Sequence, residues 1–235
     1  LEAIEVEGLV WTRPEYVKAL LGLHVGADID EGMLPSLKQK IENRGRFKNI
    51  VLSLVENLEG ATVLKVHCED LFPFFGYPFG SYNSYSGFSG SLNLSDSNLS
   101  GNLDTLSLGL SLGWNPAFST YPDCITAYNF NVGYSLSGLP GIEKWSISAN
   151  ASAGMYSNRR FDSSGLVNYW NDQTSVNGSL SLSYKILKGF GASAGLSANR
   201  RWNELTIMDP AIPAVEDTFL LSPSIGLSLS KMDYF

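Results

Sequence analysis

Few residues of this sequence combine a reactive side chain with a spacing that would let it do chemistry. The chain of 235 residues contains two histidines, His24 and His67, and two cysteines, Cys68 and Cys124. The cysteines have neither CxxC spacing nor the clustered spacing of a zinc site. His67 and Cys68 are adjacent, but no second pair of ligands accompanies them, so a structural role is favoured. The sequence therefore predicts no metal and no cofactor.

Two carboxylates near the end of the chain, Asp209 and Glu216, lie in a polar stretch between strand-like segments. General acid–base or nucleophilic catalysis needs a second group, such as a histidine or a nucleophile, within hydrogen-bond reach. No such group is near in the sequence, which predicts that the protein is not an enzyme. The net charge of -7 and the pI near 4.8 exclude a nucleic-acid surface, which needs a basic patch.

Two arginine pairs could bind anions. Arg159-Arg160 and Arg200-Arg201 both lie where a strand-like segment is expected to meet a longer polar loop. Guanidinium groups form strong hydrogen bonds with phosphate, so the pairs could bind phosphate groups of a ligand. Ordinary interfacial charge is the alternative, and it is the interpretation that we favour.

The secondary-structure pattern divides the sequence into two regions, and the first region is Leu1 to Asp70. The pattern predicts a strand, two amphipathic helices and two further strands, in that order. Thr12 is the expected N-cap of the first helix, and Asp30 is the expected cap of the second. Two helices on one face of a three-stranded sheet form a small α+β domain. The predicted elements lie within Leu1–Gly8, Thr12–Leu23, Asp28–Gly45, Phe47–Asn57 and Ala61–Asp70.

From Leu71 onward, apolar residues alternate with small polar ones. Leucine recurs at every second position from Leu106 to Leu112, with only serine and glycine between. Period two indicates β-strands, and the alternation of short turns with longer loops is typical of an outer-membrane barrel. The predicted strands are Phe74–Tyr85, Phe88–Asp96, Asp104–Trp114, Thr126–Ser137, Glu143–Ser157, Val176–Ile186, Phe190–Asn199 and Phe219–Ser230, and the predicted longer loops are Asn115–Cys124, Asn158–Asp172 and Arg200–Asp217.

The alternation also predicts which face of the strands meets lipid. A soluble β-sandwich is the alternative, but its outer face normally carries lysine, glutamate and arginine, whereas here the polar face is serine, glycine and asparagine. A closed barrel of about eight strands needs side chains that fill its interior, which small residues cannot do. The strands are therefore expected to belong to a wider barrel. The leucines expected to face lipid are Leu106, Leu108, Leu110, Leu112, Leu227 and Leu229.

A resemblance rests on the ordered stretches Ile4–Gly8, Thr12, Ala19–Asp30, Gly45–Ile50, Ser95–Asn102, Val176–Arg200 and Ser228–Phe235. Together they resemble the BamA/TamA superfamily of outer-membrane assembly factors. The resemblance implies an α+β POTRA domain of β-α-α-β-β order over residues 1–70. It implies antiparallel transmembrane β-barrel strands, about eight, over residues 71–235. Family barrels have sixteen strands and an inward-folded loop with an Arg-Gly-Phe signature, whereas this sequence has about eight predicted strands and lacks that signature. The chain is therefore expected to be a half barrel.

The resemblance also implies a location and partners. The protein would lie in an outer membrane, bacterial rather than organellar, with its POTRA domain in the periplasm. It would insert nascent outer-membrane proteins, which the POTRA domain binds by strand addition. Its further partners would be periplasmic or lipoprotein accessory subunits, the lipid bilayer, and the other barrel half from the same protein or another chain. Two alternatives stay open: a pore for two-partner secretion, and a porin-like structural barrel.

In barrels of this superfamily the first strand forms a weak seam with the last, and nascent strands enter there. The segment Phe74–Tyr85 fits that role, because Pro78 cannot donate to a ladder and Gly76 and Gly80 weaken the strand. A linker between two domains is the alternative interpretation. The residues expected to form the edge at the lateral seam are Phe75, Gly76, Tyr77, Pro78, Phe79, Gly80, Ser81 and Asn83.

Overall fold

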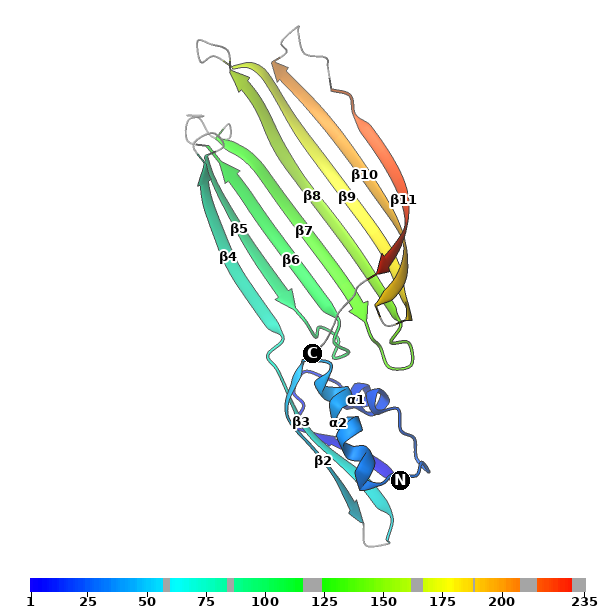
Figure 1. Ribbon diagram of the computed structural model, residues 1–235. Coiled ribbons are helices and arrows are strands. Elements are labelled where there is room, and N and C mark those ends of the chain that lie inside the picture. The colour runs from blue at the N-terminus through cyan, green and yellow to red at the C-terminus, as the bar shows by residue number, and fades with distance from the viewer. Residues whose placement is uncertain are drawn as a thin grey trace. The chain divides into compact units, whose positions relative to one another are not determined.

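The computed structural model describes residues 1–56, 60–83, 87–115, 124–161, 167–187, 189–207 and 215–229. Its elements form two compact units (Figure 1). Of the positions discussed above, Asn57, Tyr85, Asp209, residues 230–235 and parts of the three predicted longer loops lie outside the described residues. Unit 1 comprises Leu1–Phe74 with the two turns Asp96–Thr105 and Leu136–Ser146, and unit 2 comprises Phe75–Ser95, Leu106–Ser135 and Ile147–Phe235.

Unit 1 has the predicted order of a strand, two helices and two strands. Its three-stranded sheet has the order β1-β3-β2, in which β1 runs parallel and β2 antiparallel to the central β3. Helix α1 packs against β1, and α2 packs against β2 and α1. The elements are β1 (Ala3–Glu7), α1 (Pro14–Leu21), the 3-10 turn η1 (Glu31–Met33), α2 (Leu34–Glu42), β2 (Phe47–Glu56) and β3 (Thr62–Asp70).

Helix α1 begins and ends where its residue types favour it, with one difference from the prediction. Pro14 is its first residue, and Gly22 adopts a left-handed conformation, with φ of 71°, that ends it. Thr12 is not the N-cap. Arg13 occupies that position without a side-chain hydrogen bond, and the Thr12 hydroxyl instead donates to Asp70. A carboxylate distant in the sequence therefore competes successfully for the hydroxyl.

The second helix and the core follow the apolar pattern. The Asp30 carboxylate accepts a hydrogen bond from the Met33 N–H at 3.0 Å, so it caps η1, which leads into α2. No helix of the described residues is long and apolar enough to cross a membrane. The most deeply buried apolar side chains are Val17, Leu21, Leu37, Ile41, Leu64, Val66 and Cys68.

The Asp70 carboxylate, at the end of β3, holds the segment between β1 and α1. Its Oδ2 accepts the N–H groups of Val10 and Trp11, both at 2.7 Å, and of Thr12 at 3.2 Å, while its Oδ1 accepts the Thr12 hydroxyl. Burial alone would raise the pKa of Asp70, but these hydrogen bonds outweigh it and hold the pKa below its ordinary value. The carboxylate therefore stays charged and fixes this segment to the sheet.

The turn Asp96–Thr105 joins unit 1 through a buried asparagine. The Asn98 amide donates to the Thr12 hydroxyl at 2.8 Å, and its oxygen accepts the Leu103 N–H at 2.8 Å. The Arg13 N–H donates to the Gly101 carbonyl at 3.0 Å, and the Leu103 side chain packs against the hydrophobic core. Because Asn98 is buried, its two side-chain bonds satisfy amide atoms that are shielded from water.

The turn Leu136–Ser146 also contributes to unit 1. The Tyr16 hydroxyl donates to the Gly138 carbonyl at 3.4 Å, and Leu139 packs against the hydrophobic core. Gly138 has a φ of 66°, and a Cβ there would meet Nη1 of Arg44, the end of a flexible side chain that can move away. The left-handed conformation of this residue is therefore what favours glycine here.

Unit 2 is a sheet of eight strands, each beside its neighbours in the sequence. The order is β11-β10-β9-β8-β7-β6-β5-β4, and Figure 1 shows a curved sheet with β4 and β11 at opposite ends. This order confirms the predicted series of about eight antiparallel strands, and the described sheet is open. The strands are β4 (Phe74–Asn83), β5 (Gly87–Asp96), β6 (Thr105–Trp114), β7 (Ile125–Ser137), β8 (Trp145–Phe161), β9 (Val167–Leu187), β10 (Phe190–Ile207) and β11 (Thr218–Leu229).

Strands β8, β9 and β10 are longer than predicted, because much of the expected loops Asn158–Asp172 and Arg200–Asp217 is strand. Sequence periodicity detects only the part with alternating apolar residues, whereas the backbone ladder accepts polar residues as well. Asn203 pairs with Gln173 in this extension. The Asn203 oxygen accepts hydrogen bonds from the side chains of Gln173 and Asn171, so polar side chains there stabilise the strands.

Candidate functional site

The predicted seam residues lie together on β4, which is an edge strand. Within the described residues β5 is its one neighbour, and all ten β4 residues are exposed. Pro78 lies near its centre between Gly76 and Gly80. A proline within a sheet is tolerated at an edge, where the missing N–H interrupts no ladder. The structure therefore places these residues where strand addition can occur, and their function as a seam stays a prediction.

The opposite edge strand, β11, carries a proline as well. Pro223 pairs with Leu196 of β10, and β11 has no second neighbour among the described strands. None of the strands from β5 to β10 contains a proline. Sequence analysis did not single out Pro223, although a proline within a run of period two is a recognisable signal for an edge. The two prolines therefore lie on the two outermost strands of the described sheet.

The two faces of β4 are identified by its contacts with β5. The Ser81 hydroxyl lies 2.7 Å from the Ser89 hydroxyl, and a Cβ on Gly76 would lie 2.8 Å from Cδ2 of Leu94. Successive side chains of a strand point to opposite faces, so the odd-numbered residues of β4 lie with Ser89 on one face, the serine face. The even-numbered residues of β4 lie with Leu94 on the other, the leucine face, and at the centre of that face β4 carries only glycine and proline. The serine face carries an exposed aromatic row of Phe75, Tyr77 and Phe79.

The polar face of strands β6 to β10 contains a hollow of about 370 Å³. Its side chains are small and bind one another: the Asn177 amide donates to Ser152 at 3.2 Å, and the Asn199 amide donates to Asn177. All of the described side chains that line it are uncharged. Polar lining residues are Ser107, Asn131, Asn150, Ser152, Asn177, Ser179, Ser197 and Asn199.

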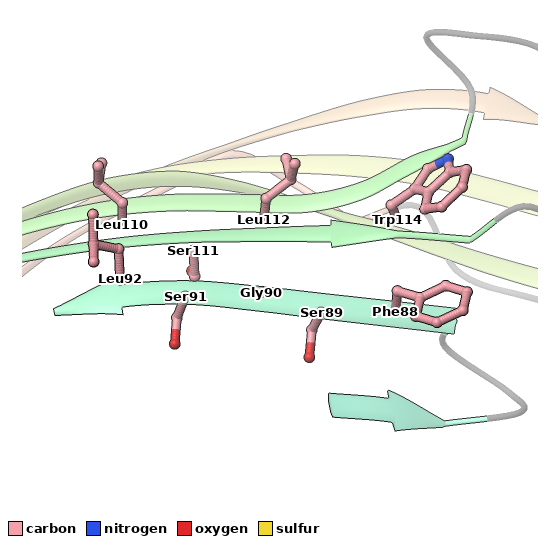
Figure 2. Close-up of a pocket in the computed structure, with 9 residues that line it drawn as sticks. All are labelled: Phe88, Ser89, Gly90, Ser91, Leu92, Leu110, Ser111, Leu112 and Trp114. Atoms are coloured by element: carbon pink, nitrogen blue, oxygen red, sulfur yellow. The ribbon is translucent and has the colours of Figure 1, made fainter. Parts of the chain in front are cut away.

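The other face of β5 and β6 is apolar, as Figure 2 shows. A groove of about 480 Å³ runs over Gly90, while Ser89 and Ser91 point to the opposite side. Its apolar walls are Phe88, Leu92, Leu110, Leu112 and Trp114.

The leucines predicted to face lipid have different exposures. Leu110 and Leu112 are half exposed, and Leu227 and Leu229 of β11 are largely exposed. Leu106 and Leu108 are partly buried, on the same face of β6 as Leu110. Contact of these six side chains with lipid stays a prediction.

The predicted position of the arginine pairs at strand–loop junctions is confirmed for the first pair and wrong for the second. Arg159 and Arg160 directly precede Phe161, the last residue of β8, whereas β10 continues past Arg201 to Ile207. Cζ of Arg159 lies 3.9 Å from the centroid of the Trp170 ring, and Cζ of Arg200 lies 5.3 Å from that of Trp202. Cation–π contacts stabilise a guanidinium beside an aromatic ring without any phosphate. Phosphate binding by the pairs stays a prediction.

The adjacent residues His67 and Cys68 do not face one another. Cys68 is buried in the core of unit 1, where burial and then the nearby Asp70 raise the thiol pKa to about 11. His67 is exposed, with Nε2 3.9 Å from Oε1 of Glu69. Neighbouring residues of a strand point to opposite faces, so the pair cannot bind one metal ion. Within the described residues, no group of three or more histidine, cysteine, aspartate or glutamate side chains could hold a metal.

Comparison with known proteins finds similarity among solved structures. No protein-family model matches the sequence, and no curated protein matches it. BamA from Haemophilus ducreyi, in a form lacking POTRA domains 1–3, matches with 15% identity and a TM-score of 0.59 over 96% of this chain and 42% of that one. CdiB from Acinetobacter baumannii matches with 16% identity and a TM-score of 0.61, over 97% of this chain and 42% of that one. CdiB from Escherichia coli matches with 18% identity and a TM-score of 0.61, over 96% and 41%.

These similarities are similarities of fold. They extend over nearly the whole of this chain, which spans about two fifths of the length of each matched structure. The open sheet of eight strands thus corresponds to part of a BamA-like barrel. The resemblance to the BamA/TamA superfamily, predicted from ordered stretches of sequence, is confirmed at the level of the fold.

Proposed function

We propose that this chain forms a POTRA domain and the first eight strands of an outer-membrane barrel that inserts nascent outer-membrane proteins. Residues 1–70 are the POTRA domain and lie in the periplasm, and residues 71–235 are barrel strands in a bacterial outer membrane. The fold likeness to BamA and the β-α-α-β-β order of unit 1 support this proposal. The remaining strands of the barrel come from the same protein or from another chain.

The observation that carries the proposal is the edge position of β4. An edge strand presents main-chain N–H and C=O groups on one side, and an extended segment can bind there by adding a strand. Pro78 and its neighbouring glycines weaken the pairing of this edge with whichever strand closes the barrel. Weak closure lets an incoming strand exchange with the closing strand. Because main-chain groups make the contact, many substrate sequences can be accepted.

Strand β2 supports the same function in unit 1. It lies at one edge of the three-stranded sheet, and Val51 and Val55 on it are exposed. An extended segment can pair with such an edge, and alternate side chains can rest on exposed apolar residues. Unit 1 would in this way hold a nascent chain, or an accessory subunit, before the strand reaches β4.

Two-partner secretion is the second candidate function. The TM-scores to CdiB, 0.61 for both structures, are slightly above the score of 0.59 to BamA, so the fold supports either function. A secretion pore would export one partner protein and would not speed the folding of other outer-membrane proteins. A porin-like barrel would conduct ions and would do neither. The experiment must therefore measure insertion directly.

The alternating directions of the backbone N–H groups along β4 identify the residue to mutate in a test of strand addition. Pro78 lacks an N–H, so its nitrogen belongs on the side of β4 that faces away from β5. Because N–H directions alternate along a strand, the N–H of Gly80 points to that same open edge, and the N–H of Ser81 points toward β5. Replacing Gly80 by proline removes a donor from the open edge. Replacing it by alanine is the matched control, since a Cβ there meets only the Ser89 carbonyl oxygen at 3.8 Å.

The test uses lipid vesicles that contain the protein, to which an unfolded outer-membrane barrel protein is added. Folding of the substrate is measured by its heat-modifiable mobility on gels. We expect the native protein and Gly80→Ala to accelerate folding and Gly80→Pro to lose most of that acceleration. If Gly80→Pro accelerates folding as much as the native protein does, β4 is not the strand that accepts the substrate. No acceleration by the native protein, together with export of a partner protein in cells, would favour two-partner secretion.

A further inference from the structure

An exposed apolar cluster lies where unit 1 leads into β4. Val10 is 78% exposed and Phe72 is 70% exposed, and the other members are close to half exposed. Three of its members are aromatic rings in mutual contact, and Val10 and Leu71 adjoin two of them in the sequence. Clustered exposed apolar residues mark an interaction site, whereas isolated ones are normal. We call the cluster the junction patch and define it as Val10, Trp11, Leu71, Phe72 and Phe74.

The aromatic members of the junction patch contact one another. The ring centroid of Trp11 lies 6.2 Å from that of Phe72 and 5.7 Å from that of Phe74, with both pairs edge to face. The rings of Phe72 and Phe74 are 5.6 Å apart. Such contacts are favourable geometries for aromatic pairs, so the rings form one surface.

Hydrogen bonds hold this surface in place. Asp70 binds the N–H groups of Val10 and Trp11, as described above, and the Leu71 N–H donates to the Arg46 carbonyl at 2.9 Å. The backbone on both sides of the patch is therefore tied to unit 1. A preformed apolar surface binds at a smaller entropic cost than a disordered one.

The position of the patch indicates what covers it. Phe74 is the first residue of β4, and an extended residue advances the chain by about 3.3 Å, so Phe72 lies within about 7 Å of that strand's start along the chain. If β4 crosses a bilayer, the junction patch lies at the depth where the strand enters. Tryptophan and other aromatic residues are enriched at that depth, since their rings suit the boundary between headgroups and acyl chains.

We infer that the junction patch inserts into the headgroup region of the bilayer on the side where β4 enters, and so anchors unit 1 to the membrane surface. The inference rests on the proposed function in one respect, namely that the strands of unit 2 cross a membrane. The occupant is a lipid surface, because the five side chains are uncharged and apolar and are contiguous with the first strand. An accessory protein is the competing occupant.

The test attaches an environment-sensitive fluorophore to single cysteines in the full chain. Cys124 is replaced by serine, while Cys68 stays, since it is buried and its raised pKa keeps it unreactive. The three labelled variants are Val10→Cys in the patch, Val25→Cys as an equally exposed valine elsewhere in unit 1, and Leu110→Cys on the apolar face of β6. The vesicles contain phosphatidylcholine and phosphatidylglycerol, with or without brominated acyl chains.

We expect the brominated lipid to quench the probes at positions 10 and 110, and aqueous iodide to quench only the probe at position 25. Adding Phe72→Ser should reduce quenching at position 10 by brominated lipid, because one ring of the patch is lost. If the probe at position 10 behaves like the probe at position 25 while brominated lipid quenches the probe at position 110, the inference is overturned. The proposal that the strands of unit 2 cross a membrane is then still supported. If brominated lipid quenches neither position 10 nor position 110, the proposed membrane strands fail and the inference fails with them.

Discussion

The side-chain amide of Asn98 lies 2.8 Å from the hydroxyl oxygen of Thr12 and donates a hydrogen bond to it. The Thr12 hydroxyl in turn donates to Asp70, so three polar side chains from separate parts of the chain form one continuous series. Both Asn98 and Thr12 are buried. A buried series of this kind is costly to break, because each group left without a partner has lost its water as well.

Replacing Asn98 by alanine is expected to destabilise unit 1 by about 1–3 kcal/mol, because the half-buried Leu103 N–H loses its acceptor and the buried Thr12 hydroxyl loses a donor. Urea unfolding monitored by tryptophan fluorescence would measure the change. Asn102→Ala in the same turn is the control, since among the described residues the Asn102 amide donates to Ser100, two residues away, and its loss should cost much less. Equal losses in the two variants would contradict the importance of the Asn98 series.

The stability of unit 1 is expected to fall at acidic pH through Asp70. Its hydrogen bonds hold its pKa below the ordinary value of 3.8 in the folded state, so its contribution is fully present above pH 3.8. The contribution is lost as the pH falls below 3.8 and through the folded-state pKa. Asp70→Asn should therefore be less stable than the native protein at neutral pH, and the difference should shrink in acid. Unfolding curves from neutral pH to below pH 3.8 measure this, with exposed Glu5→Gln as control.

An arginine on the leucine face of β6 is expected to be far more harmful than one on the serine face. Leu108→Arg places a charge on the face predicted to meet lipid, at a cost of roughly 2–4 kcal/mol near the bilayer midplane. Ser107→Arg instead directs the charge into the polar hollow, which has room for it. Folding yields of the two variants in lipid vesicles provide the comparison. Similar yields would show that the faces are wrongly assigned.

Alanine is expected to be harmful at Gly154 and harmless at Gly178. A Cβ at Gly154 would lie 2.6 Å from the Tyr128 carbonyl oxygen and 3.1 Å from Cα of Asn129, so β7 and β8 must separate locally. Overpacking of this kind typically costs about 1–3 kcal/mol. A Cβ at Gly178 meets nothing within 4 Å, and alanine there is neutral or stabilises by up to about 1 kcal/mol. Urea unfolding in vesicles measures the stability of both variants. If Gly154→Ala is as stable as the native protein, β7 and β8 can separate locally at little cost.

Local pattern was enough to predict the kind and order of the elements. Period two indicated strands in unit 2, and Pro14 and Gly22 marked the ends of α1, because these signals act within a few residues of the chain. Pro78 indicated an edge strand for the same reason, since a missing N–H is a property of one residue. The likeness to BamA also followed from the order of segments.

Other features depend on residues that are distant in the sequence, and no local pattern predicted them. Thr12 has the type and place of an N-cap, yet its hydroxyl donates to Asp70, which is 58 residues away. The extensions of β8, β9 and β10 depend on backbone pairing between polar stretches, whose side chains do not alternate in polarity.

The sequence by itself determined the strand periodicity, the helix ends and the weak edge at Pro78, since each arises from interactions between near neighbours. Only the tertiary structure decided which side chains of neighbouring strands or segments lie together on one face. The aromatic row of Phe75, Tyr77 and Phe79 is assigned to the serine face by contacts between β4 and β5, and the junction patch exists because Asp70 draws Trp11 toward Phe72. Both depend on pairing between segments that the chain must first bring together, and a linear pattern carries no distance between them.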